Sequence, residues 1–235
     1  MSSVWAVVPA AGSGRRMAAE VPKQYLKLNG VPILEHTLRA LLACPDIRGV
    51  MVVLDPSDRR ADAIPSLSDP RVSTAAGGAE RADSVLAGLQ AVSLEASEQD
   101  WVVVHDAARP CVSVALLHSL ITACVSENVG AVMAQPSVDT LKRISDDNRV
   151  VETLDRKAIW RAQTPQMFKL GELSVALSEA LANDIAITDE SMAMERAGYP
   201  VSILEGPSTN IKVTLPADLE FAEIILRRLN EESKV

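Results

Sequence analysis

The sequence predicts an α/β fold, an open and mostly parallel β-sheet with helices on both faces. Two observations predict it. Short runs rich in β-branched residues alternate along the chain with longer amphipathic segments, which is typical of parallel strands joined by helical crossovers. The short runs are almost continuously apolar, as strands are when both faces of their sheet are covered. With 235 residues, of which 48% are hydrophobic, the chain can bury a substantial core.

The first half of the chain carries the regular part of this pattern. Five segments are expected to form buried strands, namely Val4–Val8, Val50–Leu54, Val72–Ala75, Trp101–His105 and Ala131–Gln135. Three segments between them have helical spacing of apolar residues, namely Ile33–Ala43, Arg81–Val92 and Val114–Val125. Pro32 supports the first helix, because proline is favoured in the first turn. Strands and helices in this order predict crossovers that cover both faces of the sheet.

The pattern changes after Pro136. Thr140–Ser145 and Val150–Leu154 alternate in polarity around a turn cluster at 146–148, which predicts a β-hairpin. A two-stranded ribbon is only marginally stable by itself, so this hairpin must pack against something. Two interpretations are open: an arm at about residues 136–163 that docks on another subunit, or an edge hairpin that lies on its own domain.

The rest of the chain returns to the α/β pattern. We expect helices at Leu170–Leu181 and Glu190–Ala197, strands at Val201–Leu204 and Ile211–Val213, and a closing helix at about Pro216–Leu229 capped by Thr214. The sequence has no internal repeat and no linker rich in glycine and serine. Residues 1–235 are therefore expected to form a single domain with a protruding hairpin.

Composition excludes several classes of function. The 23 basic and 31 acidic residues give a net charge of −8, which disfavours binding to nucleic-acid backbones or anionic membranes. Only three Trp, two Tyr and two Phe are available to stack on bases. We therefore expect no nucleic-acid and no membrane partner. Cys44, Cys111 and Cys124 lack C-x-x-C spacing, which predicts neither a disulfide framework nor a zinc site and favours a cytoplasmic protein.

The segment after the first predicted strand is rich in glycine and then basic. It runs from Pro9 to Gly14 as P-A-A-G-S-G and continues with Arg15, Arg16 and, farther on, Lys23. Glycines lack a Cβ and let backbone N–H groups close around an anion, so the segment predicts a polyphosphate site. A dinucleotide-binding loop would have a third glycine where Met17 stands, and the end of a P-loop is absent. A plain glycine turn with solvated arginines is the alternative.

A second polar cluster, Gly77–Ser84, lies between the third predicted strand and a helix. Its glycines would let a flat base approach the backbone, and Asp83 and Ser84 would read the edge of that base. Capping of the helix by either side chain is the alternative.

Two more clusters follow the predicted strands. Asp106 comes directly after the fourth strand, at the sheet edge where open α/β proteins bind ligands. Beside a triphosphate its carboxylate would hold Mg²⁺, which takes few protein oxygens together with phosphate oxygens. His105 is more often a packed core residue than a ligand. Lys212, within Asn210–Thr214, is either a site residue or an ordinary surface lysine.

Nine short motifs, taken in order, closely resemble those of the 2-C-methyl-D-erythritol 4-phosphate cytidylyltransferase family. They are A-A-G-S-G-R-R-M, P-K-Q-Y, E-R-A-D-S-V, H-D-A-A-R-P, D-T-L-K-R, the Asp155-Arg156 pair, T-P-Q, T-D-E and N-I-K-V-T. The resemblance implies a Rossmann-like nucleotidyltransferase fold and a homodimer formed through the arm. Because the sequence ends just after the last predicted helix, we expect no second enzymatic domain. The resemblance also implies transfer of CMP from CTP to 2-C-methyl-D-erythritol 4-phosphate, with Mg²⁺, in the non-mevalonate route to isoprenoid precursors.

Matching positions imply the roles of individual residues. CTP would be bound by Pro9, Ala10, Ala11, Gly12, Ser13, Gly14, Arg15, Lys23, Gly78, Asp83, Ser84, Asp106 and Ala107. The transition state would be stabilised by Arg16 and Lys23. The phosphate of the second substrate would be positioned by Arg156 and Lys212, with further contacts from Arg109, Thr140, Thr164 and Thr188. Thr140 and Arg156 lie in or beside the proposed arm, so the resemblance implies an active site completed by the partner subunit.

Three other functions compete with this one. A cytidylyltransferase for another polyol phosphate, such as ribitol 5-phosphate, would share the CTP motifs and differ around the second substrate. A nicotinamide-dependent oxidoreductase would use the glycine loop and Asp55, but Met17 and the distance to Asp55 disfavour it. A nucleotide-binding module without catalysis would not need charged residues from five separate segments.

Overall fold

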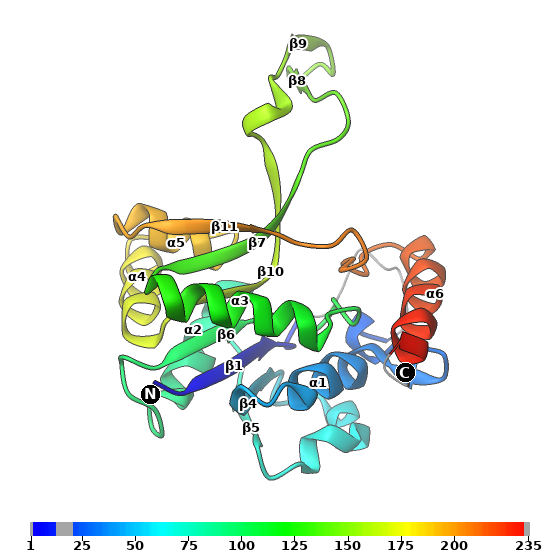
Figure 1. Ribbon diagram of the computed structural model, residues 1–235, viewed down its shortest axis with the longest axis vertical. Coiled ribbons are helices and arrows are strands. Elements are labelled where there is room, and N and C mark those ends of the chain that lie inside the picture. Colours follow the sequence, from blue (N-terminus) through cyan, green and yellow to red (C-terminus); the bar gives the residue numbers. More distant parts are fainter. Residues whose placement is uncertain (1, 13–20, 233–235) are drawn as a thin grey trace.

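The computed structural model describes residues 2–12 and 21–232, and in these residues the chain folds around a seven-stranded sheet (Figure 1). The strand order is β11-β7-β10-β6-β1-β4-β5. The strands are β1 (Val4–Pro9), β4 (Ile47–Leu54), β5 (Val72–Ala76), β6 (Trp101–Val104), β7 (Gly130–Pro136), β10 (Trp160–Lys169) and β11 (Val201–Glu205). Among the described strands of this sheet, β10 alone runs antiparallel to its neighbours. The predicted open and mostly parallel sheet is therefore confirmed.

Helices cover both faces of the sheet, as predicted. The helices are α1 (Ile33–Ala43), α2 (Arg81–Val92), α3 (Val114–Glu127), α4 (Leu170–Ala182), α5 (Glu190–Arg196) and α6 (Ala217–Glu232). Side chains of β1 point alternately to two cores. Ala6 and Val8 pack in the core that includes α1 and α3, while Trp5 and Val7 pack in the core that includes α2, α4 and α5. This two-sided burial explains the continuous apolar runs in the sequence.

A third, smaller core lies under α6. Leu28, Cys111, Val213 and Leu226 are buried in it. Leu28 belongs to a two-stranded sheet of β2 (Lys27–Leu28) and β3 (Val31–Pro32), and short 3-10 helices occupy η2 (Lys23–Tyr25), η3 (Arg59–Ala63), η4 (Pro65–Ser68) and η5 (Arg156–Ala158). Because Val213 is buried here, the segment that precedes α6 is held against the loop that follows β6.

The predicted hairpin consists of β8 (Lys142–Ile144) and β9 (Val150–Thr153), which pair antiparallel. Figure 1 shows it standing away from the sheet, at the end of the long extensions of β7 and β10. Four apolar side chains of this segment are more than half exposed, namely Val138, Ile144, Val150 and Val151. The hairpin therefore has no core of its own within the described chain.

The strand β10 is the main element that the sequence does not predict. Proline lacks the N–H that a sheet interior requires, so Pro165 in the middle of this segment argues against a strand. Gln163 and Gln166 add polar groups, yet both are buried. The pairing of β10 with β7 shifts in register between Ala162 and Gln166, and Pro165 lies within this irregularity.

Two predictions near the C-terminus are wrong. Ile211–Val213 is not a strand, because its two backbone hydrogen bonds, from Ile211 to Thr209 and from Val213 to Ala108, both of 2.8 Å, do not form a ladder. The last helix begins at Ala217, beyond the predicted cap Thr214. The carboxylate of Asp218 accepts the N–H of Thr214 at 2.8 Å, so an acidic side chain inside the first turn holds this end of the helix.

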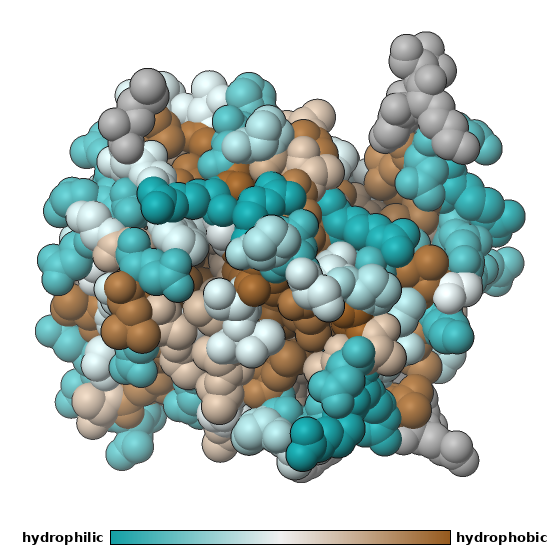
Figure 2. Space-filling model, turned by 90° about the horizontal axis from the view of Figure 1, so that it is seen from below, coloured by the Kyte–Doolittle hydropathy of each residue, from teal (hydrophilic) through white to brown (hydrophobic). Residues whose placement is uncertain are grey.

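Figure 2 shows the molecule from the side opposite the hairpin, where hydrophilic and hydrophobic residues are interspersed. Within the described part of the chain, none of the helices has both the length and the apolar character needed to cross a bilayer. Cys44, Cys111 and Cys124 are free thiols and are buried.

Candidate active site

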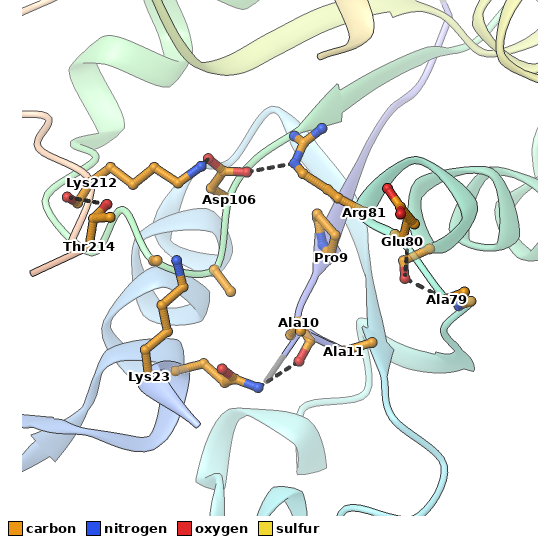
Figure 3. Close-up of a pocket in the computed structure, with 16 residues that line it drawn as sticks. Pro9, Ala10, Ala11, Lys23, Ala79, Glu80, Arg81, Asp106, Lys212 and Thr214 are labelled. Carbon is orange, nitrogen blue, oxygen red and sulfur yellow. Dashed lines mark hydrogen bonds and ion pairs between the residues drawn. The ribbon is translucent and has the colours of Figure 1, made fainter. Parts of the chain in front are cut away.

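Loops that follow three parallel strands meet at the carboxyl edge of the sheet, where open α/β proteins bind ligands. The loops after β1, β5 and β6 enclose a cavity of about 340 Å³ together with η2 and the segment before α6 (Figure 3). Its lining consists of Pro9, Ala10, Ala11, Gly12, Lys23, Gln24, Gly78, Ala79, Glu80, Arg81, Ser84, Asp106, Ala107, Ala108, Lys212 and Thr214. Ten of the residues predicted for the site therefore lie around one cavity.

The loop after β1 is fixed from two sides. The N–H of Ala10 donates to the carbonyl of Val53 at 2.8 Å, and its own carbonyl accepts the side-chain amide of Gln24 at 2.8 Å. Gln24 is buried and follows Lys23 in η2. The hydrogen bond from Gln24 thus sets the distance between this loop and η2, and Figure 3 shows Lys23 extending into the cavity.

The loop after β5 needs glycine at two consecutive positions. A Cβ on Gly77 would collide with the Cβ of Ala11, and a Cβ on Gly78 would collide with the Cβ of Asp83. These glycines let the loop after β5 pack directly against the loop after β1 and against the first turn of α2. Both loops contribute residues to the lining of the cavity.

Asp83 and Ser84 differ in role. Ser84 lines the cavity, where its hydroxyl accepts the N–H of Gly78 at 3.2 Å and donates to the carbonyl of Glu80 at 3.1 Å. Asp83 is not part of the lining: its carboxylate accepts the N–H of Glu80 at 2.9 Å in a capping box. In this structure the carboxylate of Asp83 caps its own helix, the alternative left open for it, and its contact with a base stays a prediction.

A cluster of opposite charges surrounds Asp106. Arg81 and Lys212 approach its carboxylate from opposite sides (Figure 3), with Arg81 Nε 3.0 Å from Oδ1 and Lys212 Nζ 2.7 Å from Oδ2. Arg109 Nε lies 3.7 Å from Oδ2. Arg81 also donates through both terminal nitrogens to the carboxylate of Glu190, at 2.7 and 3.1 Å. Lys212 therefore lies at the cavity and pairs with Asp106, as expected for a site residue.

Burial and neighbouring charges act in opposite directions on the pKa values of Asp106, Arg81 and Arg109. Burial alone would raise the pKa of Asp106, but the charges of Arg81 and Lys212 outweigh it and hold that pKa well below its usual range. Burial works against the charge of Arg81, whereas Glu190 and Asp106 raise its pKa above the ordinary value. For Arg109 burial is the larger effect and lowers the pKa.

A second cavity of about 250 Å³ shares Arg81, Asp106 and Lys212 with the first. The rest of its lining consists of Arg109, Ala162, Gln163, Thr164, Gln166, Thr188 and Asp189. The hydroxyl of Thr164 accepts the N–H of Asp106 at 3.0 Å, which ties β10 to the loop after β6. Arg109, Thr164, Thr188 and Lys212, all predicted for the second substrate, are thus brought together.

His105 lies in the protein core. Its side chain is fully buried and lines neither cavity. Nε2 donates to the carbonyl of Arg109 at 3.1 Å, and burial lowers the pKa of the imidazole to about 4. His105 is therefore neutral at pH 7 and supports the loop that carries Asp106.

Several predicted residues lie elsewhere or outside the described residues. Thr140 and Arg156 line neither cavity, and the guanidinium of Arg156 donates to the carbonyl of Val138 at the foot of the hairpin. Four others fall outside the described residues, namely Ser13, Gly14, Arg15 and Arg16.

Sequence reasoning missed three residues that shape this site. Arg81 and Glu190 form the ion pair beside Asp106, and Gln24 links the loop after β1 to η2. Each lies inside one of the short motifs, E-R-A-D-S-V, T-D-E and P-K-Q-Y. Those motifs were therefore the available signal for these residues. The partner of each residue, however, lies far away in the sequence or in another element, so the motifs did not show the contact.

An open α/β sheet with a glycine-lined cavity at its carboxyl edge, converging lysine and arginine side chains and an adjoining polar cavity is the arrangement of an α/β nucleotidyltransferase. A model of the 2-C-methyl-D-erythritol 4-phosphate cytidylyltransferase family matches residues 4–228. The chain therefore belongs to this family and is a cytidylyltransferase.

Individual relatives agree over nearly the whole length. The 2-C-methyl-D-erythritol 4-phosphate cytidylyltransferase of Vibrio vulnificus is 48% identical over 228 residues, which cover 97% of this chain and 96% of the relative. The protein of the same name from Ectopseudomonas mendocina is 51% identical over 216 residues, 92% of each chain.

Solved structures give the same result for the fold. The 2-C-methyl-D-erythritol 4-phosphate cytidylyltransferase of Francisella tularensis superposes with a TM-score of 0.81 at 35% identity, covering 95% of this chain and all of that one. The enzyme of the same name from Thermus thermophilus gives a TM-score of 0.78 at 32% identity, covering 96% and 99%. The predicted nucleotidyltransferase fold is thereby confirmed.

Proposed function

We propose that the first cavity binds CTP and that the second binds 2-C-methyl-D-erythritol 4-phosphate. The enzyme transfers CMP from CTP to this phosphate and produces 4-diphosphocytidyl-2-C-methyl-D-erythritol and pyrophosphate, a step of the non-mevalonate route to isoprenoid precursors. The observation that carries the assignment of the cavities is their common wall, formed by Arg81, Asp106 and Lys212. Substrates bound in the two cavities would meet at this wall.

The reaction needs cations more than it needs a base. The attacking phosphate monoester is already largely ionised at pH 7, because its second pKa is about 6. Its approach to the α-phosphate of CTP is opposed by repulsion of about 4 kcal/mol for two unit charges at about 4 Å in a medium of effective dielectric about 20. Neutralising this charge and holding the reactants in line are therefore the main tasks of the site.

The described residues are suited to both tasks. In the ion-pair cluster that includes the common wall, three cations, Arg81, Arg109 and Lys212, pair with two carboxylates, Asp106 and Glu190, so the cluster has an excess of one positive charge. Lys23 adds a further cation on the CTP side. Arginine offers a planar fork for phosphate oxygens and lysine a mobile point charge. The wall would thus attract both substrates and hold them close together.

Asp106 is the carboxylate that we propose as the protein ligand of Mg²⁺. It lines both cavities, and its Oδ1 accepts a hydrogen bond from Arg81, which leaves a lone pair for a metal. In residues 2–12 and 21–232 no three His, Cys, Asp or Glu side chains come together to bind a metal. One carboxylate supplemented by CTP phosphates fits Mg²⁺, which keeps water and phosphate ligands. When bound, the ion would neutralise charge on the triphosphate.

The hairpin supports a proposal that the enzyme is a homodimer in which each arm reaches the partner's active site. Thr140 and Arg156 line neither cavity of their own chain, although both match positions for the second substrate. The exposed apolar side chains of the hairpin, such as Ile144 and Val150, would be covered in such a dimer. We place the enzyme in the cytoplasm, which the three buried free thiols support.

Pyrophosphate release by the purified protein tests the proposed function. CTP, ATP, GTP and UTP are compared, each with and without 2-C-methyl-D-erythritol 4-phosphate, and ribitol 5-phosphate is the competing acceptor. We expect release only with CTP and 2-C-methyl-D-erythritol 4-phosphate together. Equal or faster release with ribitol 5-phosphate would assign the second cavity to another polyol phosphate. Equal release with any nucleotide would contradict the assignment of the first cavity.

Replacing Lys23 by alanine is expected to lower kcat by about 100-fold, the scale of losing one preorganised charged donor. The same loss is expected for Arg16→Ala, although Arg16 lies outside the described residues. Lys169→Ala is the matched control, because Lys169 stacks on Trp101 at the opposite end of β6. A folded Lys23→Ala protein with the kcat of Lys169→Ala would remove Lys23 from the mechanism.

A further inference from the structure

We propose that Glu190 is a positioning residue of this reaction: through Arg81 it fixes the carboxylate of Asp106 and, with it, the ammonium of Lys212 that receives the phosphate of the second substrate. The inference rests on the proposed function. It adds a buried carboxylate that lines neither cavity but is bound to a residue that lines both.

The four side chains form a continuous chain of charge-assisted hydrogen bonds. Glu190 accepts two of them from the terminal nitrogens of Arg81, at 2.7 and 3.1 Å. Arg81 turns its Nε to Oδ1 of Asp106 at 3.0 Å. Oδ2 of Asp106 lies 2.7 Å from Nζ of Lys212. The fork-to-fork contact fixes the plane of the guanidinium, so the direction in which Nε points at Asp106 is set by Glu190.

Glu190 itself is held rigidly. Its side chain is only 1% exposed, and the residues on both sides of it are bound to neighbouring groups. Asp189 caps α5 by accepting the N–H of Met192 at 3.1 Å and also accepts the side-chain amide of Gln166 at 2.9 Å. Ser191 donates its N–H to Gln166 at 2.8 Å. Since Gln166 belongs to β10, the start of α5 cannot shift without moving a strand of the sheet.

The ion pair also joins the two halves of the site. Arg81 opens α2, which follows the loop of the CTP cavity, whereas Glu190 opens α5, next to Thr188 in the second cavity. Glu190 balances the charge of Arg81 and occupies two of its donors. Without that carboxylate the guanidinium would be free to turn toward phosphate in either cavity, and Asp106 would lose the contact that orients it.

This reasoning gives Glu190→Gln an unusual pair of effects. The kcat/KM for 2-C-methyl-D-erythritol 4-phosphate is expected to fall about 10-fold or more, as for other groups that act through a ligand-binding side chain. The Kd of CTP measured without Mg²⁺, so that the proposed metal ligand Asp106 is not probed, is expected to stay the same or to decrease, because one negative charge near the triphosphate has been removed. General damage to the fold would instead weaken the binding of both substrates together.

The experiment measures Kd for CTP by calorimetry and steady-state kinetics in the second substrate, for wild type, Glu190→Gln and Glu190→Asp. Glu195→Gln is the control, because Glu195 is exposed on the same helix. Glu190→Asp keeps the charge and is expected to recover part of kcat/KM, and it carries the test if Glu190→Gln does not fold. A double-mutant cycle with Arg81→Gln is expected to be non-additive, with Glu190→Gln changing kcat/KM less than about 2-fold when Arg81 is absent.

Three outcomes would overturn the proposal: unchanged kinetics in Glu190→Gln, a parallel loss of CTP binding, or full additivity with Arg81→Gln. Failure of the proposed function is distinguishable from these outcomes. In that case the wild-type protein itself would fail to release pyrophosphate from CTP and 2-C-methyl-D-erythritol 4-phosphate.

Discussion

The cluster around Asp106 and the hairpin β8–β9 both contain paired charges, but the pairs differ in their exposure to water. The carboxylates of Asp106 and Glu190 are 9% and 1% exposed. In the hairpin, the pair of Arg143 and Glu152 has similar contact geometry at 2.8 Å, yet its side chains are 61% and 45% exposed. Distance alone therefore does not distinguish the two regions, whereas burial does.

This difference shows what each region depends on. Charges removed from water are costly unless their partners are in place, so the cluster is ordered by its own members before any substrate binds. The hairpin differs, because both its ion pairs and its apolar side chains, such as Ile144 and Val150, are exposed to water. We therefore expect such a region to gain stability from contacts outside its own chain, as in the proposed dimer.

The largest effect is expected for Asp106→Asn, which removes the charge that three cations share. Breaking a buried pair costs about 3 to 5 kcal/mol, and we expect a loss of about 2 to 3 kcal/mol in unfolding free energy here because Arg81 and Lys212 keep part of their side chains in water. Turnover is expected to fall by about 100-fold or more. Denaturant unfolding at neutral pH and pyrophosphate release measure the two losses.

The matched control for this variant is Asp147→Asn in the hairpin. Asp147 pairs with Arg149 at 2.9 Å, but the two side chains are largely exposed. We expect its unfolding free energy to change by less than about 0.5 kcal/mol. Equal losses of unfolding free energy in Asp106→Asn and Asp147→Asn would show that burial does not explain the difference between the two regions.

A smaller effect is expected for Arg156→Ala, at the foot of the hairpin. The KM for 2-C-methyl-D-erythritol 4-phosphate is expected to rise about 10-fold, the cost of one charged phosphate contact. Binding of CTP is expected to be intact, because Arg156 does not line the first cavity. Kinetics in each substrate and calorimetry with CTP separate these effects. Loss of CTP binding would contradict the role given to this side chain.

Co-expression of Arg156→Ala with Lys23→Ala chains tests whether the arm serves the partner. A hybrid dimer would hold one site with both defects and one site with neither, so random pairing restores about a quarter of wild-type turnover. If each arm serves its own chain, the mixture shows only the average of the two variants. Measurement at low 2-C-methyl-D-erythritol 4-phosphate makes the defect of Arg156→Ala visible.

The same contrast explains how much of the fold follows from the sequence. Strands buried on both faces, such as β1 and β6, are continuous apolar runs, so their local pattern predicts them correctly. The strand β10 escaped prediction because Pro165 and buried glutamines interrupt that pattern, and its place between β6 and β7 depends on pairing with distant residues. Ile211–Val213 has the local pattern of a strand but has no strand beside it.

The site divides in a similar way. Residues held by backbone geometry, such as Gly78 and Ala10, follow from the glycine-rich segments after strands. Glu190 was missed because its partner Arg81 lies 109 positions away, and their contact exists only after α2 and α5 have packed on the sheet. The contact of Asp83 with a base stays a prediction, and the sequence did not show that a local contact with Glu80 also uses its carboxylate. The spacing of motifs shows neither which local backbone groups compete for a side chain nor which distant residues form ion pairs.

The smallest effect is expected for the cross-strand pair of Arg143 and Glu152. A double-mutant cycle with alanine at both positions is expected to give a coupling energy below about 0.5 kcal/mol, because both groups are hydrated in the separate and the paired state. The cycle is measured by denaturant unfolding at low and at high salt. A coupling above about 2 kcal/mol that salt does not weaken would mean that this pair is buried in solution, as it would be if a partner subunit covered this side of the hairpin. The cycle therefore also reports whether the exposed charges of the hairpin remain in water when the enzyme assembles.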